Sequence, residues 1–121
     1  MSNIAIEETA ALIASDKVEG TAVYNRAGER LGSITNFMVD KVSGTVRYAV
    51  LSFGGFLGIG QDCYPLPWSM LTYDTDKGGY VVDLDKELLK NAPRYERDSE
   101  PVHDRDYSRS VYDYYGVTFP F

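Results

Sequence analysis

The sequence is poor in the residue types that most often carry chemistry. Its 121 residues include one cysteine, Cys63, and one histidine, His103. A single cysteine excludes an intramolecular disulfide, which suits a reducing compartment. No second histidine is present to activate a serine or cysteine nucleophile. We therefore predict that the protein is not an enzyme, and we expect Cys63 to be a small buried apolar residue.

Positive charge and long apolar runs are also scarce. The chain has 12 lysines and arginines against 18 acidic residues, a net charge of −6. Nucleic-acid-binding proteins usually present a basic face, so we expect no direct binding of nucleic acid. No segment approaches the roughly 20 apolar residues that span a bilayer, and the N-terminus lacks the basic start of a signal peptide. These features predict a cytoplasmic protein that does not insert into membranes.

Two segments invite a cofactor or metal interpretation. His103 lies near Asp104 and Asp106, and imidazole and carboxylate are metal-ligand types. We expect these side chains to be solvated, because they lie in a polar stretch. The glycine-rich segment 54–60 is not followed by the lysine and serine or threonine of a phosphate-binding loop. No metal and no cofactor is predicted.

What the sequence does contain is a series of short β-rich segments separated by turns. Their spacing is nearly even and the connections are mostly tight, which favours a small barrel or sandwich over a fold with parallel crossovers. A closed barrel would also remove exposed strand edges. We expect six or so strands, drawn from residues 12–15, 21–25, 31–41, 45–53, 63–67, 70–73 and 80–84.

Some of these segments carry more specific signals. The segment 45–53 is almost continuously apolar after Arg47, so we expect a central strand covered on both faces. Pro65 and Pro67 predict an edge or kinked strand, because proline cannot donate to a ladder. Phe37 and Val39 are expected to share the core face of their strand. Trp68 is expected to plug one end of the barrel.

The last third of the chain changes character. Asp85 is a good N-cap for a short helix over 86–92 that Pro93 ends, with Leu88 and Leu89 facing the body. Residues 95–106 are polar and indicate an exposed linker.

Aromatic residues concentrate after this linker. Residues 106–115 have helical apolar spacing and are followed by Gly116, which predicts a short amphipathic helix. A disordered tail is rarely this aromatic, so we expect the barrel or a partner to bury it.

Together these segments resemble the PRC-barrel family, a β-barrel module found in the photosynthetic reaction centre H subunit and in a ribosome maturation factor. The resemblance rests on residues 20–24 and 28–34, on 44–52, on the GGFLGIG loop at 54–60, and on the YPLPW run at 64–68 with Leu71. It implies a mainly β fold: a small six-stranded PRC-type β-barrel, then a short helix and an aromatic C-terminal tail. The expected domains are an N-terminal arm (1–11), the barrel (12–93), and a linker with the tail (94–121).

The resemblance implies a stand-alone bacterial barrel used for binding rather than catalysis. We expect a non-enzymatic protein–protein interaction and assembly module that self-associates as a homodimer. One alternative is a ribosome maturation or RNA-metabolism accessory protein that binds a ribosomal protein, and another is a regulator associated with a membrane or photosynthetic complex. The predicted interaction surface consists of Phe56, Leu57, Ile59, Tyr112, Tyr114, Tyr115 and Phe119.

Overall fold

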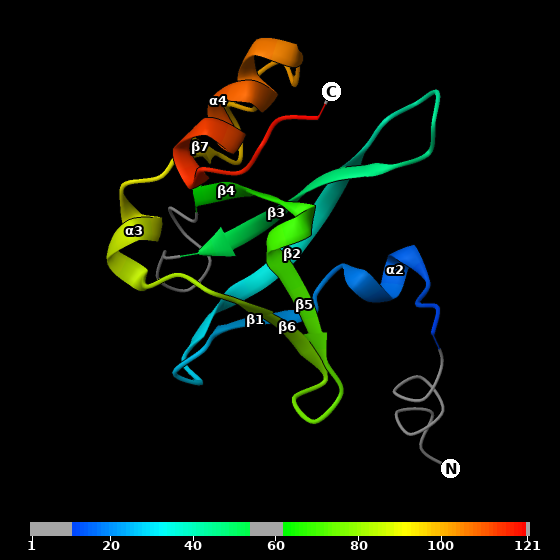
Figure 1. Cartoon of the computed structure of the whole chain (residues 1–121), viewed down its shortest axis with the longest axis vertical. Helices are drawn as coiled ribbons and strands as arrows, with labels where there is room; N and C mark the ends of the chain where they lie inside the picture. The colour runs from blue at the N-terminus through cyan, green and yellow to red at the C-terminus, as the bar shows by residue number, and fades with distance from the viewer. Residues whose placement is uncertain (1–10, 54–61, 121) are drawn as a thin grey trace.

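The computed structural model describes residues 11–53 and 62–120. Its strands are β1 (Ala22–Asn25), β2 (Arg30–Val39), β3 (Val46–Phe53), β4 (Asp62–Pro67), β5 (Leu71–Asp74), β6 (Gly79–Val82) and β7 (Tyr95–Glu96). The helices are α2 (Ser15–Val18), the 3₁₀ turn η1 (Trp68–Met70), α3 (Lys86–Lys90) and α4 (Arg105–Tyr115). Figure 1 shows that β5 and β6 lie at one end of the molecule and α4 at the other.

The strands form one sheet in the order β5-β6-β1-β2-β3-β4-β7. The mainly β fold is confirmed, but the six-stranded closed barrel is wrong. Seven strands pair, and within the described residues no pairing joins β5 to β7. The unpredicted β7 pairs Tyr95 with Cys63 and Glu96 with Asp62. Local sequence does not reveal such a strand, because its position on β4 rather than its own propensity stabilises it.

The expected first strand over residues 12–15 is also wrong. Residues 15–18 form the single turn α2, and residues 11–14 have no regular structure. Every residue from 11 to 17 is exposed, and Val18 alone in this stretch packs into the core. The segment 12–15 has no strand beside it to pair with, so it does not join the sheet despite its β-forming residues.

β2 and β3 form the longest hairpin, and its arm extends beyond the rest of the sheet (Figure 1). The predicted turn over 40–44 is confirmed, and Gly44 adopts the positive φ that it requires. Near the base of the hairpin, Gly32 allows the two strands to approach closely. A Cβ at this position would lie 2.0 Å from the carbonyl oxygen of Ser52.

The projecting arm explains one failed expectation. Phe37 packs against the main core, whereas Val39, on the same strand, is exposed. At Val39 the arm has passed the body of the sheet, so no second layer covers the side chain. The pairing also jumps from Tyr48 opposite Met38 to Val46 opposite Val39, which leaves Arg47 as a bulge in β3.

β3 is central and buried, as predicted. Its alternate side chains enter two different clusters: Ala49 and Leu51 belong to the main core, and Tyr48 and Val50 to a second core beneath α4. The second core also contains Cys63, confirming that this cysteine is buried. The main core is built from Val18, Val23, Leu31, Ile34, Ala49, Leu51, Tyr64, Leu66, Tyr80, Val82, Leu84, Leu89 and Ala92.

β4 carries the two prolines and behaves as they predict. Only Asp62 and Cys63 pair with β7, so within the described residues the remainder of β4 has a strand on one side only. Pro65 and Pro67 lie in this remainder. They need no ladder donor there, because the outer side of the strand is an edge.

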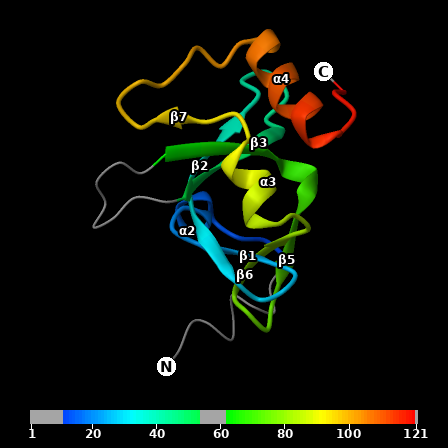
Figure 2. The ribbon, with the colours of Figure 1, turned by 90° about the vertical axis from the view of Figure 1, so that its left-hand side faces the viewer.

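Both predicted C-terminal helices exist. The Asp85 carboxylate accepts a hydrogen bond from the backbone N–H of Leu88, but α3 ends at Lys90 and Leu88 is exposed, so Leu89 alone of the leucine pair is buried. Asp104 caps α4, and Gly116 ends it in the left-handed conformation. Figure 2 shows α4 above the β3–β4 end of the sheet. In the described part of the chain, no helix is long and apolar enough to cross a membrane.

Candidate functional site

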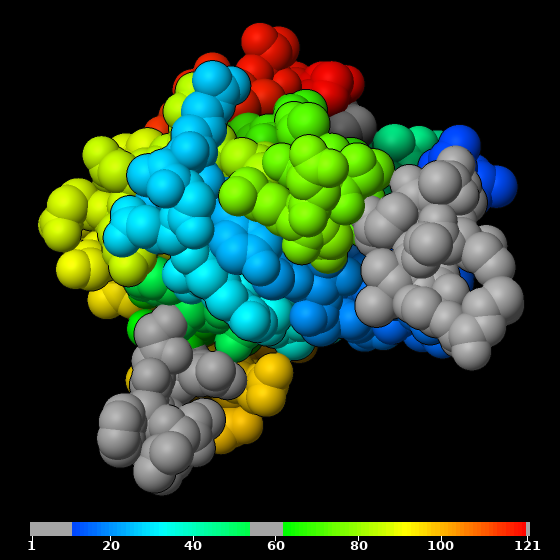
Figure 3. Space-filling model, turned by 90° about the horizontal axis from the view of Figure 1, so that it is seen from below, coloured from blue at the N-terminus to red at the C-terminus, as the bar shows by residue number. Residues whose placement is uncertain are grey.

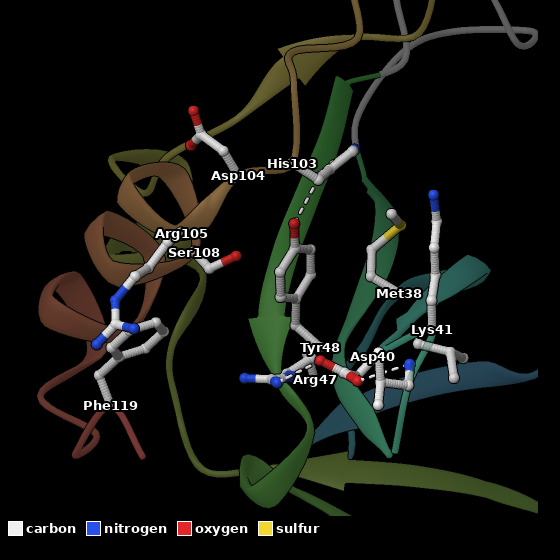
Figure 4. Close-up of a pocket in the computed structure, with 12 residues that line it drawn as sticks. Met38, Asp40, Lys41, Arg47, Tyr48, His103, Asp104, Arg105, Ser108 and Phe119 are labelled. Carbon is white, nitrogen blue, oxygen red and sulfur yellow. Dashed lines mark hydrogen bonds and ion pairs between the residues drawn. The ribbon is translucent and has the colours of Figure 1, made fainter. Parts of the chain in front are cut away.

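A groove separates the β2–β3 arm from α4 and the segment after it. Its volume is about 640 Å³, within the range of ligand and peptide sites. The groove is lined by Met38, Val39, Asp40, Lys41, Val42, Arg47 and Tyr48 from the hairpin and by His103, Asp104, Arg105, Ser108 and Phe119 from the C-terminal part (Figure 4).

The hairpin wall is shaped by Asp40. One of its carboxylate oxygens accepts the backbone N–H groups of Val42 and Ser43, and the other pairs with the Arg47 guanidinium at 2.5 Å. The Ser43 and Arg47 hydrogen bonds are the main reasons that the pKa of Asp40 is lowered to about 2. The carboxylate therefore stays ionised at neutral pH, and it holds both the turn and the arginine in place.

The floor of the groove contains a chain of hydrogen bonds. The buried Tyr48 hydroxyl lies 2.5 Å from His103 Nδ1, and His103 Nε2 lies 2.7 Å from a Glu100 carboxylate oxygen. A carboxylate can only accept, so Nε2 carries the proton and donates to Glu100. In neutral His103 the Nδ1 atom is then an acceptor, which makes Tyr48 the donor. Figure 4 shows the Tyr48 ring pointing at His103.

His103 is not solvated, contrary to expectation. Its side chain is only 12% exposed, and the ring centroids of Tyr48, Tyr95 and Tyr107 lie 5.6–5.8 Å from its own. The sequence holds a weak signal for this arrangement, since Glu100 and Tyr107 lie three and four residues away. The decisive partner, Tyr48, comes from β3, 55 residues away, and Tyr95 reaches His103 only because β7 pairs with β4, so a local reading of the polar stretch misses both.

α4 forms the opposite wall and is fixed by its buried face. Val111 is fully buried, and the Tyr112 hydroxyl donates to the backbone carbonyl of Arg47 at 2.5 Å. That carbonyl belongs to the bulge residue of β3, which has no place in the β2 register. The Tyr112 hydroxyl therefore ties α4 to the bulge in β3.

The segment after α4 folds back along the helix. The Phe119 ring lies edge-on to Tyr112, and the Arg105 and Arg109 guanidiniums lie 5.7 Å and 5.2 Å from its centroid. Such cation–π contacts hold the ring at the rim of the groove. Arg105 lies beside Phe119 in Figure 4.

The structure divides the predicted interaction surface. Tyr112 is buried, the Tyr114 hydroxyl donates to the Leu88 carbonyl, and Tyr115 packs against the main core. These three side chains contact other parts of the same chain, and among the predicted tail residues Phe119 alone lines the groove. Phe56, Leu57 and Ile59 lie outside the described residues. Sequence reasoning did not select the hairpin wall, because neither Asp40 nor Val42 belongs to a recognisable motif.

Burial changes the pKa of two side chains in this region, Tyr48 in the groove and Cys63 in the second core. Burial raises the pKa of Tyr48 to about 12, partly offset by a hydrogen bond with Ser108. Burial also raises the pKa of the Cys63 thiol, which disfavours the reactive thiolate. Within residues 11–53 and 62–120, no three histidine, cysteine, aspartate or glutamate side chains are grouped to hold a metal ion.

Comparison with known proteins agrees with the resemblance read from the sequence. The family model of the PRC-barrel domain matches residues 12–89, more than half of the chain. The chain belongs to the PRC-barrel family. Its open seven-stranded sheet and the hairpin–helix groove are thus features of a PRC-barrel protein.

Individual relatives are distant. An uncharacterized protein of Deinococcus radiodurans is 25% identical over 79 residues, which is 65% of this chain and 28% of that protein. Among solved structures, a putative 16S ribosomal RNA processing protein, RimM, from Pseudomonas aeruginosa matches with 18% identity and a TM-score of 0.42. That match covers 65% of this chain and 48% of the RimM chain. The chain thus spans less than a third of the one protein and about half of the other.

Proposed function

We propose that this PRC-barrel chain is a non-enzymatic assembly module that self-associates as a homodimer through the hairpin and the groove. The observation that carries the proposal is the side chain of Val42, which is 98% exposed at the mouth of the groove. An apolar side chain held in water by a rigid turn favours contact with a second apolar surface. Val39, also exposed on the arm, extends the same apolar strip.

The polar groups of the groove support binding rather than catalysis. Asp40 is engaged by Arg47, and His103 is engaged on both ring nitrogens. Tyr48 keeps its proton well above neutral pH. A general base needs a pKa near the working pH and a free path to its substrate. The pKa values of Asp40 and Tyr48 lie far from neutral pH, and both ring nitrogens of His103 are already hydrogen-bonded.

A second copy of the chain is the occupant that fits both walls. The arm offers Val42 with the exposed cation Lys41, whereas the opposite wall offers the Phe119 ring and, at the start of α4, the exposed Asp104. A two-fold axis would lay the arm of each copy against the helix wall of the other, so each contact would occur twice. The valine would then meet the aromatic ring, and the lysine would meet the aspartate.

Sedimentation velocity over a concentration series tests the proposal. The wild-type chain should form dimers, and Val42→Asp should weaken the dimer about tenfold or more, because it places a charge in an apolar contact. Val102→Asp is the matched control, since Val102 is 79% exposed and does not line the groove. A wild-type chain that stays monomeric at high micromolar concentration, or equal effects of the two substitutions, would refute the proposal.

A second proposal concerns a ribosomal protein as partner. The net charge of −6 favours a basic protein over RNA as the binding surface. Affinity purification of the native complex should then recover a defined basic ribosomal protein in stoichiometric amount, with salt-sensitive binding. Recovery of the chain with only its own copies would rule out this second proposal and leave the first intact.

A further inference from the structure

The outer edge of β2 carries no strand along the projecting arm. β1 pairs with β2 only at residues 30–33, and the segment before β1 follows the same edge as far as Ile34. Figure 3 views the molecule from below, where β1 and the start of β2 lie beside the β5–β6 hairpin. Farther along the arm, none of the described segments pairs with the outer edge of residues 36–39.

The direction of the backbone groups on this edge follows from the turn. The Asp40 N–H donates to the Thr45 carbonyl at 2.8 Å, so Asp40 faces β3. Successive residues of an antiparallel strand direct their N–H and C=O groups alternately toward the partner strand and away from it. The Arg47 bulge lies in β3, so this alternation continues along β2 without a break. Phe37 and Val39 therefore direct their backbone groups outward.

The other end of the edge agrees with this count. Ile34 also faces outward, because its carbonyl accepts from the Gly20 N–H at 2.7 Å and its N–H donates to the Thr21 carbonyl at 2.9 Å. Thr35 is a bulge in β2, and the open edge begins after it. Beyond Thr35, the outward N–H and C=O groups meet no hydrogen-bonding partner within the described residues.

The open edge also lacks the charges and prolines that keep strand edges from pairing. Natural sheets protect their edges with such residues, and the outer edge of β4 carries Pro65 and Pro67. Residues 35–39, with the sequence TNFMV, contain neither a proline nor a charge. Val39 is 44% exposed there. An uncharged open edge of this kind favours the addition of another strand.

We propose that this edge pairs with the same edge of a second copy, antiparallel about a two-fold axis at Met38. With the two Met38 residues opposite each other, Phe37 of each copy lies opposite Val39 of the other. Both residues face outward, so four hydrogen bonds across the axis would satisfy all four outward groups of each chain. A two-fold contact requires a surface that is complementary to itself, and this edge meets that requirement.

The side chains of this arrangement also match. Opposite residues of antiparallel strands have their side chains on the same face of the sheet, so the exposed Val39 would pack on Phe37 of the second copy. Phe37 is supported by Trp68 from the main core, with the ring centroids 6.1 Å apart. The pairing would therefore remove from water two valine side chains that the single chain leaves exposed.

The edge contact is separate from the groove contact of the proposed dimer. The side chains of Met38 and Val39 line the groove, but the pairing uses backbone groups on the outer side of β2. The groove contact brings the arm of one copy to the helix wall of the other, so it does not place two Met38 residues together. Where both contacts form, copies would associate beyond the dimer.

Disulfide trapping of Met38→Cys in the full chain tests the edge contact. Two residues at this position would form a non-hydrogen-bonded pair with Cα atoms about 4.5 Å apart, within the range of about 4.4–6.8 Å that a disulfide spans. Val102→Cys is the matched control, because Val102 is 79% exposed and lies outside the edge. On oxidation, Met38→Cys should form the cross-linked dimer about tenfold faster than the control. The wild-type chain, whose Cys63 is buried, should not cross-link.

Two second changes in the Met38→Cys chain identify the contact. Val39→Pro removes one outward N–H and no donor of the β2–β3 ladder, so it should lower cross-linking to the rate of Val102→Cys without changing the circular dichroism. Val42→Asp should leave the rate unchanged, which separates this result from the groove dimer. Equal rates for Met38→Cys and Val102→Cys would overturn the proposal, even where the proline variant fails to fold. Loss of cross-linking with Val42→Asp, or full cross-linking in a folded Val39→Pro chain, would also overturn it.

Discussion

Replacing Tyr112 by phenylalanine removes a single hydroxyl from the contact between α4 and the sheet. That hydroxyl donates to the backbone carbonyl of Arg47, at the β3 bulge that lies outside the β2 register. The ring itself is buried and would remain, packed against Phe119. The substitution therefore isolates one hydrogen bond without opening a cavity.

The expected loss is that of one part-buried hydrogen bond. Such a bond contributes about 0.5–1.5 kcal/mol net. We expect Tyr112→Phe to lower the free energy of unfolding by about 1.5 kcal/mol. Tyr114→Phe is the matched control, because its hydroxyl donates to the Leu88 carbonyl at an exposed position where water can replace it. Its loss should stay near about 0.5 kcal/mol.

Urea unfolding followed by far-UV circular dichroism measures both variants. For a urea m-value of about 1–3 kcal/mol/M, the Tyr112→Phe midpoint should fall by about 1 M with little change in slope. Limited proteolysis should also cut the chain before α4 faster in this variant. Equal midpoints for Tyr112→Phe and Tyr114→Phe, or no change from the wild type, would refute the idea that the bulge carbonyl anchors the helix.

Three further outcomes are expected. Gly32→Ala should abolish cooperative thermal unfolding, because its Cβ would lie 2.0 Å from a backbone oxygen. The control Gly20→Ala has open space around the Cβ but a positive φ, so it should lower the free energy of unfolding by only about 1 kcal/mol. Similar melting temperatures for the two variants would contradict this. The pKa of Asp40 is lowered from 3.8 to about 2, so the stabilisation by its carboxylate is present above pH 4 and is lost as the pH falls toward 2. Asp40→Asn should therefore reduce the change of the free energy of unfolding with pH between pH 4 and 2, as measured by urea unfolding. The same pH dependence in the variant and the wild type would count against this. Burial raises the pKa of Tyr48 from 10 to about 12, so the unfolded chain loses this proton at lower pH than the folded chain, and the free energy of unfolding should fall above pH 10. Tyr48→Phe should reduce that fall. An identical dependence of stability on pH above 10 in the variant would argue against a buried phenol.

Features that depend on a few neighbouring residues were predictable from the sequence. The turn at 40–44, the cap Asp85 and the helix end at Gly116 all follow from short-range backbone chemistry, and each lies where its residues indicate. The continuous apolar pattern of β3 likewise predicts its central position, because both of its faces must be covered.

Features that depend on distant partners were not predictable. β7 and the mostly covered position of His103 exist because β4 and Tyr48 lie beside them, and nothing in the polar segment 95–106 specifies those neighbours. The seven-stranded open sheet follows from β1 pairing with β6 in parallel, a contact between segments more than 50 residues apart. Composition and spacing thus determined a mainly β chain with capped C-terminal helices. The groove arises only in the folded chain, because a bulge in β3 and a tyrosine in α4 meet there.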